Sequence, residues 1–163
     1  MNDPTRQTLR IALATDDAGV GLRDAVADLL REDPRVAEVQ DFGVPDREDK
    51  TPYPVPCIRA AEAVRDGRAD RAVVFGGTGL GEAISANKVA GVRAAAATDP
   101  FSLERSVLSN DCQVLALGER VVGRQLALRL VTDWLGYTFD PTSPSAQKLA
   151  VIADYERTGR LEP

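Results

Sequence analysis

Short apolar runs alternate along this chain with longer segments in which apolar residues recur every three or four positions. The short runs are typical of buried strands, and the longer segments are typical of helices with one apolar face. Strands are predicted at 9–15, 36–43, 71–75, 93–98 and 113–118. Helices are predicted at 22–30, 53–65, 81–88, from the Asp99-Pro100 start through 108, at 123–136, and from a Ser143-Pro144 cap to Gly159.

Strands that alternate with helices predict an α/β fold, with an open, mainly parallel, doubly wound sheet covered by helices on both faces. We expect one domain over residues 1–163 with a C-terminal helical extension, because no repeat, low-complexity tract or linker divides the chain. Ligands of such sheets bind beyond the carboxyl ends of the strands, where the chain order reverses. Asp16 and Asp17 follow the first strand and a glycine-rich segment follows the third, so both are expected at one crevice.

The overall charge argues against two classes of partner. A formal net charge of −5 gives no support to nucleic acid or a membrane surface as the main partner. No apolar run approaches the length of a membrane span, and the first ten residues contain no signal-peptide core. We therefore expect a cytoplasmic protein.

The chain contains no histidine, so no imidazole can serve as a base or as a metal ligand. Cys57 and Cys112 are far apart and match no metal-ligand or CxxC spacing. Carboxylates are therefore the leading candidates for acid–base chemistry, ahead of cysteine, tyrosine and lysine.

The segment VVFGGTGLGEAISANK joins the third strand to a helix through Gly77, Gly79 and Gly81. Glycines allow positive φ and a close approach of the backbone to a ligand, and exposed amides suit a phosphate or a developing oxyanion. Thr78 adds a hydroxyl at the same place. A tight turn without a ligand is the alternative explanation of the glycines, and the spacing fits neither a Walker A motif nor a dinucleotide fingerprint.

Glu82 directly follows the last of these glycines and allows two interpretations. It is either a first-turn glutamate that stabilises the helix through the macrodipole, or a general base beside an oxyanion site. The second arrangement suits proton abstraction next to a carbonyl, with amides and Thr78 holding the enediolate. The residues alone do not decide between the two.

The segments ATDDAG, GGTGLGEAISANKVAGVRAA and SNDCQVLALGERVVG together resemble a sugar-phosphate isomerase family. This family contains the type B ribose-5-phosphate isomerases and the galactose-6-phosphate isomerase subunits. The resemblance covers nearly the whole chain and implies a Rossmann-like fold and an aldose–ketose isomerase without a metal or other cofactor. It also implies a homodimer or homotetramer in which each site is shared across a subunit interface.

The resemblance assigns roles to individual residues. Many relatives place a cysteine base at the position of Gly76, whereas an actinobacterial-type branch uses a glutamate at the end of a GGSGNGE-like loop. GGTGLGE matches that branch, which implies Glu82 as the base and Thr78 in place of the serine that steadies the enediolate. Asp16 matches an aspartate that helps ring opening, and Arg120 matches an arginine that contacts phosphate.

Other positions depart from the family pattern. Asp17 stands where the family has a histidine that reaches toward the phosphate, and Ser109 replaces a histidine linked to ring opening, with Asn110 retained. On the last helix only Lys148 matches one of two phosphate-binding arginines, and a lysine lacks their bidentate geometry. Tyr53 occupies the place of a tyrosine near the sugar, where a packing role is equally plausible.

These departures bear on the substrate. The loss of ring-opening histidines matters less for a sugar too short to close a stable ring through its phosphate-bearing carbon. FDPTSPSAQKLAVI also resembles the C-terminal segment of the erythrulose-4-phosphate isomerases in the family. We therefore expect a phosphorylated sugar of four or five carbons: a four-carbon phosphosugar fits these departures, ribose 5-phosphate is the five-carbon candidate, and an unphosphorylated sugar is the alternative.

Two competing functions stay open from the sequence. The first is a catalytically silent sugar-binding or partner subunit, because a silenced copy of the enzyme would show this many altered site positions. Glu82 argues against it, since a silent copy has little reason to keep a carboxylate where one branch has its base. The second, a nucleotide-binding signalling domain, rests on fold analogy alone.

Overall fold

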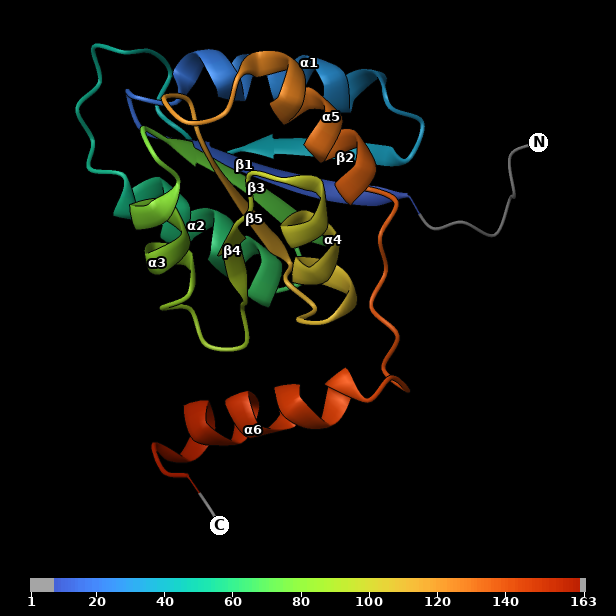
Figure 1. Ribbon diagram of the computed structural model, residues 1–163. Helices are drawn as coiled ribbons and strands as arrows, with labels where there is room; N and C mark the ends of the chain where they lie inside the picture. Colours follow the sequence, from blue (N-terminus) through green and yellow to red (C-terminus); the bar gives the residue numbers. More distant parts are fainter. Residues whose placement is uncertain (1–7, 162–163) are drawn as a thin grey trace.

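The computed structural model describes residues 8–161, in which a single five-stranded sheet forms the centre of the molecule (Figure 1). The strand order is β2-β1-β3-β5-β4, and every neighbouring pair is parallel. The strands are β1 (Leu9–Thr15), β2 (Val36–Asp41), β3 (Arg71–Gly76), β4 (Ala94–Ala96) and β5 (Val114–Gly118). The helices are α1 (Val20–Glu32), α2 (Pro54–Arg65), α3 (Leu80–Ala86), α4 (Pro100–Leu108), α5 (Arg124–Trp134) and α6 (Ser145–Thr158).

The chain order reverses between β1 and β3, the two strands at the middle of the predicted crevice. From β1 the chain crosses to β2 on one side and returns to β3 on the other. Thr15, the last residue of β1, is in register with Phe75, and Gly76 at the end of β3 is in register with Gly118 of β5. The loops that follow β1, β3 and β5 therefore leave the sheet side by side, as expected for a ligand site in a doubly wound fold.

The two faces of the sheet carry side chains of different size. One face is lined by large residues such as Leu13, Phe75 and Leu117, which pack against α1, α4 and α5 with the fully buried Trp134. The other face is lined by small residues such as Ala12, Ala14 and Ala116, which pack against α2 and α3. Figure 1 shows α1 and α5 over one face and α2 and α3 over the opposite one. Small side chains let α2 and α3 lie close to the sheet, which matters for the site below.

The predicted α/β order is confirmed, with differences at the ends of elements. Asp99 caps α4 as expected, since its carboxylate accepts a hydrogen bond from the backbone N–H of Ser102 at 2.8 Å. The side-chain cap expected at Ser143 is wrong. The backbone is already helical at Pro144, and the amide of Ala146 bonds to the carbonyl of Ser143 rather than to its hydroxyl.

The edge segments are shorter than predicted. The strand expected at 93–98 is reduced to Ala94–Ala96, and the strand expected at 36–43 ends at Asp41. Both lie at the margins of the sheet, where each strand has a neighbour on one side only. Such strands have half the ladder hydrogen bonds of a central strand, so the apolar pattern overstates their length.

Helix α6 is the expected C-terminal extension and stands apart from the sheet (Figure 1). None of its residues is buried, and its apolar side chains Val151, Ile152 and Tyr155 are each more than half exposed. Glu156 connects it to the rest of the chain by accepting a hydrogen bond from the amide of Gly91 at 2.7 Å. Within residues 8–161, no helix is long and apolar enough to cross a membrane.

Candidate active site

The loop from β3 to α3 makes a sharp turn at the carboxyl edge of the sheet. Gly79 is the N-cap of α3 and has a φ of 81°, a left-handed conformation that strongly favours glycine. The hydroxyl of Thr78 accepts a hydrogen bond from the amide of Leu80 at 3.3 Å, so it lies at the start of the helix. The loop packs tightly on β5, because a Cβ built on Gly118 would lie 2.4 Å from the carbonyl carbon of Thr78.

Glu82 points back from the first turn of α3 toward the end of β3. Its side chain is buried, with 3% of the residue exposed. A Cβ built on Gly76 would lie 1.7 Å from Glu82 Oε1 and 2.3 Å from its Cδ. The carboxylate therefore fills the space that a side chain at position 76 would need.

The surroundings of Glu82 act on its pKa in opposite directions. Burial raises the pKa of the carboxyl most, and the nearby charge of Asp16 raises it further. The backbone amides of Glu82 and Gly79 favour the charged form and oppose this rise. A carboxylate at the third helical position that reaches back to the N-cap amide is typical of a capping box.

The two interpretations of Glu82 from the sequence are therefore compatible. Contacts with the helix start orient the carboxylate, and burial moves its pKa toward neutrality. Among the described residues it forms no ion pair with a lysine or arginine. A buried carboxylate with a raised pKa and no cationic partner is suited to accept a proton.

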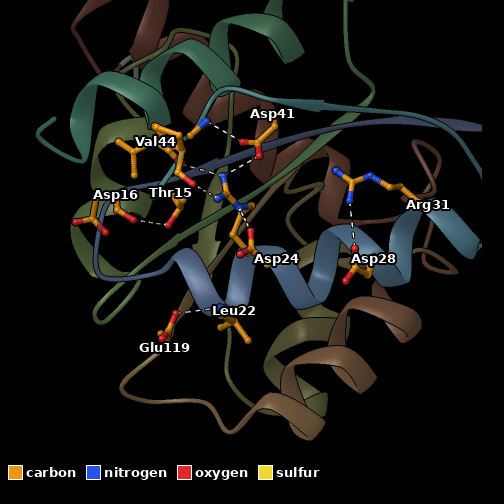
Figure 2. Close-up of polar contacts among 12 residues, drawn as sticks. Thr15, Asp16, Leu22, Asp24, Asp28, Arg31, Asp41, Val44 and Glu119 are labelled. Atoms are coloured by element: carbon orange, nitrogen blue, oxygen red, sulfur yellow. Dashed lines mark hydrogen bonds and ion pairs between the residues drawn. The ribbon is translucent and has the colours of Figure 1, made fainter. Parts of the chain in front are cut away.

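The two aspartates after β1 lie at the same edge but differ in their contacts. Asp16 Oδ1 accepts a hydrogen bond from the amide of Ala18 at 2.9 Å, and its carbonyl accepts one from the Thr15 hydroxyl at 2.8 Å (Figure 2). Asp17 Oδ2 pairs with Lys50 Nζ at 2.6 Å. The hydrogen bond from Lys50 lowers the pKa of the Asp17 carboxyl, so Asp17 is held in its charged form.

Two predicted binding residues lie against the glycine loop. The backbone N–H of Arg120 donates to the carbonyl of Gly77 at 3.1 Å, and its guanidinium Nη1 lies 3.3 Å from a Cβ built on Gly77. The ring of Tyr53 lies against Gly81, with its hydroxyl 2.9 Å from a Cβ built there. The expected proximity of Arg120 and Tyr53 to the loop is therefore observed.

Cys57 is a buried residue of α2 close to Glu82 and Asp16. It lies one turn after Tyr53 on α2 and has no exposed surface. Burial, followed by the charges of Glu82 and Asp16, raises the pKa of its thiol well beyond the ordinary value. Cys57 thus stays protonated beside Glu82, as expected for a small core residue. Burial likewise raises the pKa of Cys112 to about 11.

Ser109, Asn110 and Lys148 do not reach this site within one chain. Ser109 and Asn110 lie at the end of α4, where they bond to the side chain and the backbone carbonyl of Arg105, just before the amino end of β5. A strand rises about 3.3 Å per residue, so the two ends of β5 are about 13 Å apart. Lys148 is exposed on α6, which stands apart from the sheet.

The sequence reasoning missed the loop between β2 and α2, which reaches this edge with Arg47 and Lys50. Arg47 Nη1 donates to the carbonyl of Asp17 at 3.0 Å, and its Nη2 pairs with Glu119 Oε1 at 2.5 Å. Glu119 Oε2 in turn accepts a hydrogen bond from the amide of Leu22 at 2.9 Å (Figure 2). The signal was available, since loops after parallel strands line the ligand crevice.

No group of three or more His, Cys, Asp or Glu side chains converges as a metal site in the part of the chain that the structure describes. The residues gathered at the edge include carboxylates, backbone amides, hydroxyls and the cations Arg47, Lys50 and Arg120. Such a set can abstract a proton and stabilise an oxyanion.

Comparison with known proteins places this geometry in a family. Residues 11–152 match the family described as Ribose/Galactose Isomerase. D-erythrulose-4-phosphate isomerase 2 of Mycolicibacterium smegmatis is 52% identical over 148 residues, which cover 91% of this chain and 97% of that protein. Ribose-5-phosphate isomerase B of Escherichia coli is 40% identical over the same shares of each chain.

A solved structure agrees with the sequence comparison. The ribose-5-phosphate isomerase B of Clostridium thermocellum has a TM-score of 0.87 and 40% sequence identity. The similarity covers 93% of this chain and all of that one.

The contact between Gly76 and Glu82 predicts a coupled pair of substitutions. Gly76→Ala should lower the free energy of unfolding by about 1–3 kcal/mol, because the new methyl group overlaps the buried carboxylate. In a Glu82→Ala background the same substitution should cost much less, since the overlapping atoms are gone. Chemical denaturation of the four proteins measures both costs, and equal costs would show that the two residues are not in contact.

The raised pKa of Glu82 predicts how stability depends on pH. The folded protein binds the Glu82 proton more tightly than the unfolded chain, so this group's contribution falls as pH rises from its unfolded pKa through its folded pKa. Glu82→Gln has no such titration. As pH rises, the free energy of unfolding of the variant should therefore increase relative to that of wild type, by about 1.4 kcal/mol for each unit by which folding raises the pKa of Glu82.

Denaturation of both proteins between pH 4 and pH 8 checks this. An advantage of the variant that grows with pH and then levels off is expected. A variant that becomes less stable than wild type as pH rises would show that helix contacts outweigh burial at Glu82.

Proposed function

We propose a substrate and a mechanism for this chain, which belongs to the Ribose/Galactose Isomerase family and is an aldose–ketose isomerase. The substrate that the observations support best is a four-carbon ketose phosphate, erythrulose 4-phosphate, which the enzyme converts to the corresponding aldotetrose 4-phosphate. The relative from Mycolicibacterium smegmatis, at 52% identity, is named for this ketose. We place the reaction in the cytoplasm.

Ring chemistry supports a four-carbon substrate. In an aldotetrose 4-phosphate the C4 oxygen carries the phosphate and cannot attack the aldehyde, so no five-membered ring has to be opened. Ribose 5-phosphate has a free C4 hydroxyl and forms such a ring. Ser109 and Asp17 stand where related enzymes carry histidines, and their replacement costs least for a substrate that is always open. Ribose 5-phosphate is therefore the second candidate.

Glu82 is the proposed base. Its carboxylate removes a proton from C1 of the ketose while the C2 carbonyl gains negative charge, which gives an enediolate. The same carboxyl group returns the proton to C2, and a proton moves from the C1 oxygen to the C2 oxygen. The product is the aldose, with no net change in atoms or electrons and with no metal in the route.

The remaining residues of the edge bind the substrate and its oxyanion. The amides of residues 77–81, including Gly77, Gly79 and Gly81, together with the Thr78 hydroxyl, face the developing charge. Asp16 holds a sugar hydroxyl, and Tyr53 packs beside the sugar. Arg120 supplies a guanidinium for the phosphate.

The burial of Glu82 without a cationic partner among residues 8–161 is the observation that carries this proposal. Burying a charged group is costly unless it is paired, and a silent binding subunit would gain nothing from that cost. An active base gains a pKa nearer neutrality. The enzyme therefore explains the site better than a silent subunit does.

Solvent deuterium exchange tests the base. Wild type should introduce deuterium at the carbon beside the carbonyl of erythrulose 4-phosphate in D₂O. Glu82→Gln should reduce the rate by between about 10² and 10⁴, because it keeps the shape of the side chain but cannot accept the proton. NMR of each sugar over time provides the measurement, with ribose 5-phosphate and unphosphorylated erythrulose run in parallel.

Glu62→Gln is the matched control, since Glu62 lies on α2 and pairs with Arg65 away from the site. It should exchange as fast as wild type. Exchange by Glu82→Gln at the wild-type rate would remove Glu82 from the mechanism. Binding of a sugar phosphate by wild type without any exchange would instead support the silent subunit.

A homodimer with shared sites would bring the distant residues into place. Ser109, Asn110 and Lys148 lie far from Glu82 within one chain, and α6 leaves Val151 and Ile152 exposed. A second copy whose α4 end and α6 approach the glycine loop would add Asn110 and Lys148 to the site and cover the apolar side of α6. By two-fold symmetry each chain would complete the site of the other.

Mixing two inactive variants tests the shared site. Glu82→Gln and Asn110→Ala homodimers should each be impaired, because both sites of each carry the change. After unfolding and refolding together, a heterodimer has one site with both changes and one site with neither, so the mixture should recover about a quarter of wild-type activity. Light scattering gives the oligomeric state, and a mixture no more active than its components would show that the site is built within one chain.

A further inference from the structure

The loops that follow β1, β3 and β5 carry more negative charge than a phosphorylated substrate would tolerate. Asp16, Asp17, Glu82 and Glu119 are carboxylates, and Arg120 is the only cation among the residues that these loops bring to the edge. A phosphate that approaches this group meets like charges, which oppose its binding. Another element has to supply positive charge.

The loop between β2 and α2 supplies that charge. In Figure 1 it leaves the arrowhead of β2 and follows this edge of the sheet to α2. Lys50 Nζ lies 2.6 Å from Asp17 Oδ2, and Arg47 Nη2 lies 2.5 Å from Glu119 Oε1. Arg47 and Lys50 thus offset the carboxylates of Glu119 and Asp17, with which they pair, although the same loop also carries Asp46, Glu48 and Asp49.

The base of the same loop is fixed to the rest of the molecule by a buried arginine. Arg23 of α1 is 5% exposed and pairs with Asp24 at 2.6 Å and with Asp41 at 2.7 Å. Its guanidinium also donates to the carbonyl of Val44 at 3.1 Å. Figure 2 shows Asp24, Asp41 and Val44 gathered at this point. A buried charge with this many partners fixes the start of the loop and thereby the position from which Lys50 extends.

Lys50 has a largely exposed side chain whose ammonium keeps a donor free for a ligand. Its side chain is 69% exposed, and it holds Asp17 and the carbonyl of Arg47, at 2.7 Å, on the protein side. An ammonium group has three donors, and these two contacts leave one for a ligand. Arg47 bonds both to the carbonyl of Asp17 and to Glu119, the residue before Arg120, so Lys50 and Arg120 lie at the same edge of the sheet.

We propose that Lys50 binds the phosphate group of the substrate directly, together with Arg120, and that Asp17 positions the Lys50 ammonium for this contact. This inference rests on the proposed function, because it requires a phosphorylated substrate.

Three variants test the contact: Lys50→Gln, Lys50→Arg and the double variant Asp17→Asn/Lys50→Gln. Lys50→Gln should raise both the Kd for inorganic phosphate and the KM for erythrulose 4-phosphate on the order of tenfold, with little change in kcat. Lys50→Arg should recover part of the loss. Calorimetric titration with inorganic phosphate measures binding without turnover, and steady-state assays give kcat and KM.

The double variant separates direct contact from simple screening of Asp17. If Lys50 only neutralised Asp17, removal of both charges would restore wild-type phosphate binding, and that result would overturn the inference. If Lys50 contacts the phosphate, the double variant stays weak. Arg31→Gln is the control for loss of a positive charge, since Arg31 pairs with Asp28 on the exposed side of α1 (Figure 2), and it should match wild type.

The outcomes also separate this inference from the proposed function. Phosphate binding that depends on Lys50, in a protein that isomerises no sugar phosphate, would refute the function and leave the phosphate site standing. Isomerisation with an unchanged KM and Kd in Lys50→Gln would refute the phosphate site and leave the function standing. Failure of wild type to bind inorganic phosphate would also refute the phosphate site.

Discussion

The missing side chain at Gly76 is the constraint on which the site depends. A Cβ there would lie 1.7 Å from Glu82 Oε1, so the carboxylate of the proposed base can reach the end of β3 only because residue 76 is glycine. The turn that returns Glu82 to this point needs the left-handed backbone of Gly79. It also needs the close packing of Thr78 on Gly118 at the end of β5. A change at any of these glycines would move the carboxylate away from the strand ends.

The unequal faces of the sheet explain why Glu82 is buried so close to the surface of the fold. Small residues such as Ala14 and Ala116 line the face under α2 and α3, so both helices approach the sheet closely. Tyr53, at the N-cap of α2, and Cys57 within α2 then lie against the loop and the carboxylate. With large residues on this face, as on the other one, α2 would stand farther away and water would reach Glu82. The core packing thus contributes to the chemistry of the site.

The apolar pattern predicted the order of strands and helices because each buried strand and each amphipathic helix has its own periodicity. It also predicted that Asp16 and the glycine loop share one edge, since parallel strands end on the same side. It could not predict the orientation of Glu82, which depends on the space left by a residue six positions earlier. Nor did the assignment of Ser109 and Asn110 to the site take account of the direction of β5. Both residues precede β5, so within one chain they lie at the opposite end of the sheet from the glycine loop. Arg47 and Lys50 escaped notice because charged loop residues resemble a solvated surface.

A chain without histidine has to produce a group that exchanges protons near neutral pH from side chains that ordinarily do not. The structure shifts the pKa values of the candidate groups in different directions. Burial raises the pKa of Glu82 toward neutrality, while the ammonium of Lys50 lowers the pKa of Asp17 and keeps it charged. Burial and neighbouring carboxylates move the pKa of the Cys57 thiol away from neutrality. Divergent environments of this kind suit neighbouring groups to different roles, and they support the proposal that Glu82 carries the proton while Asp17 stays charged and Cys57 stays neutral.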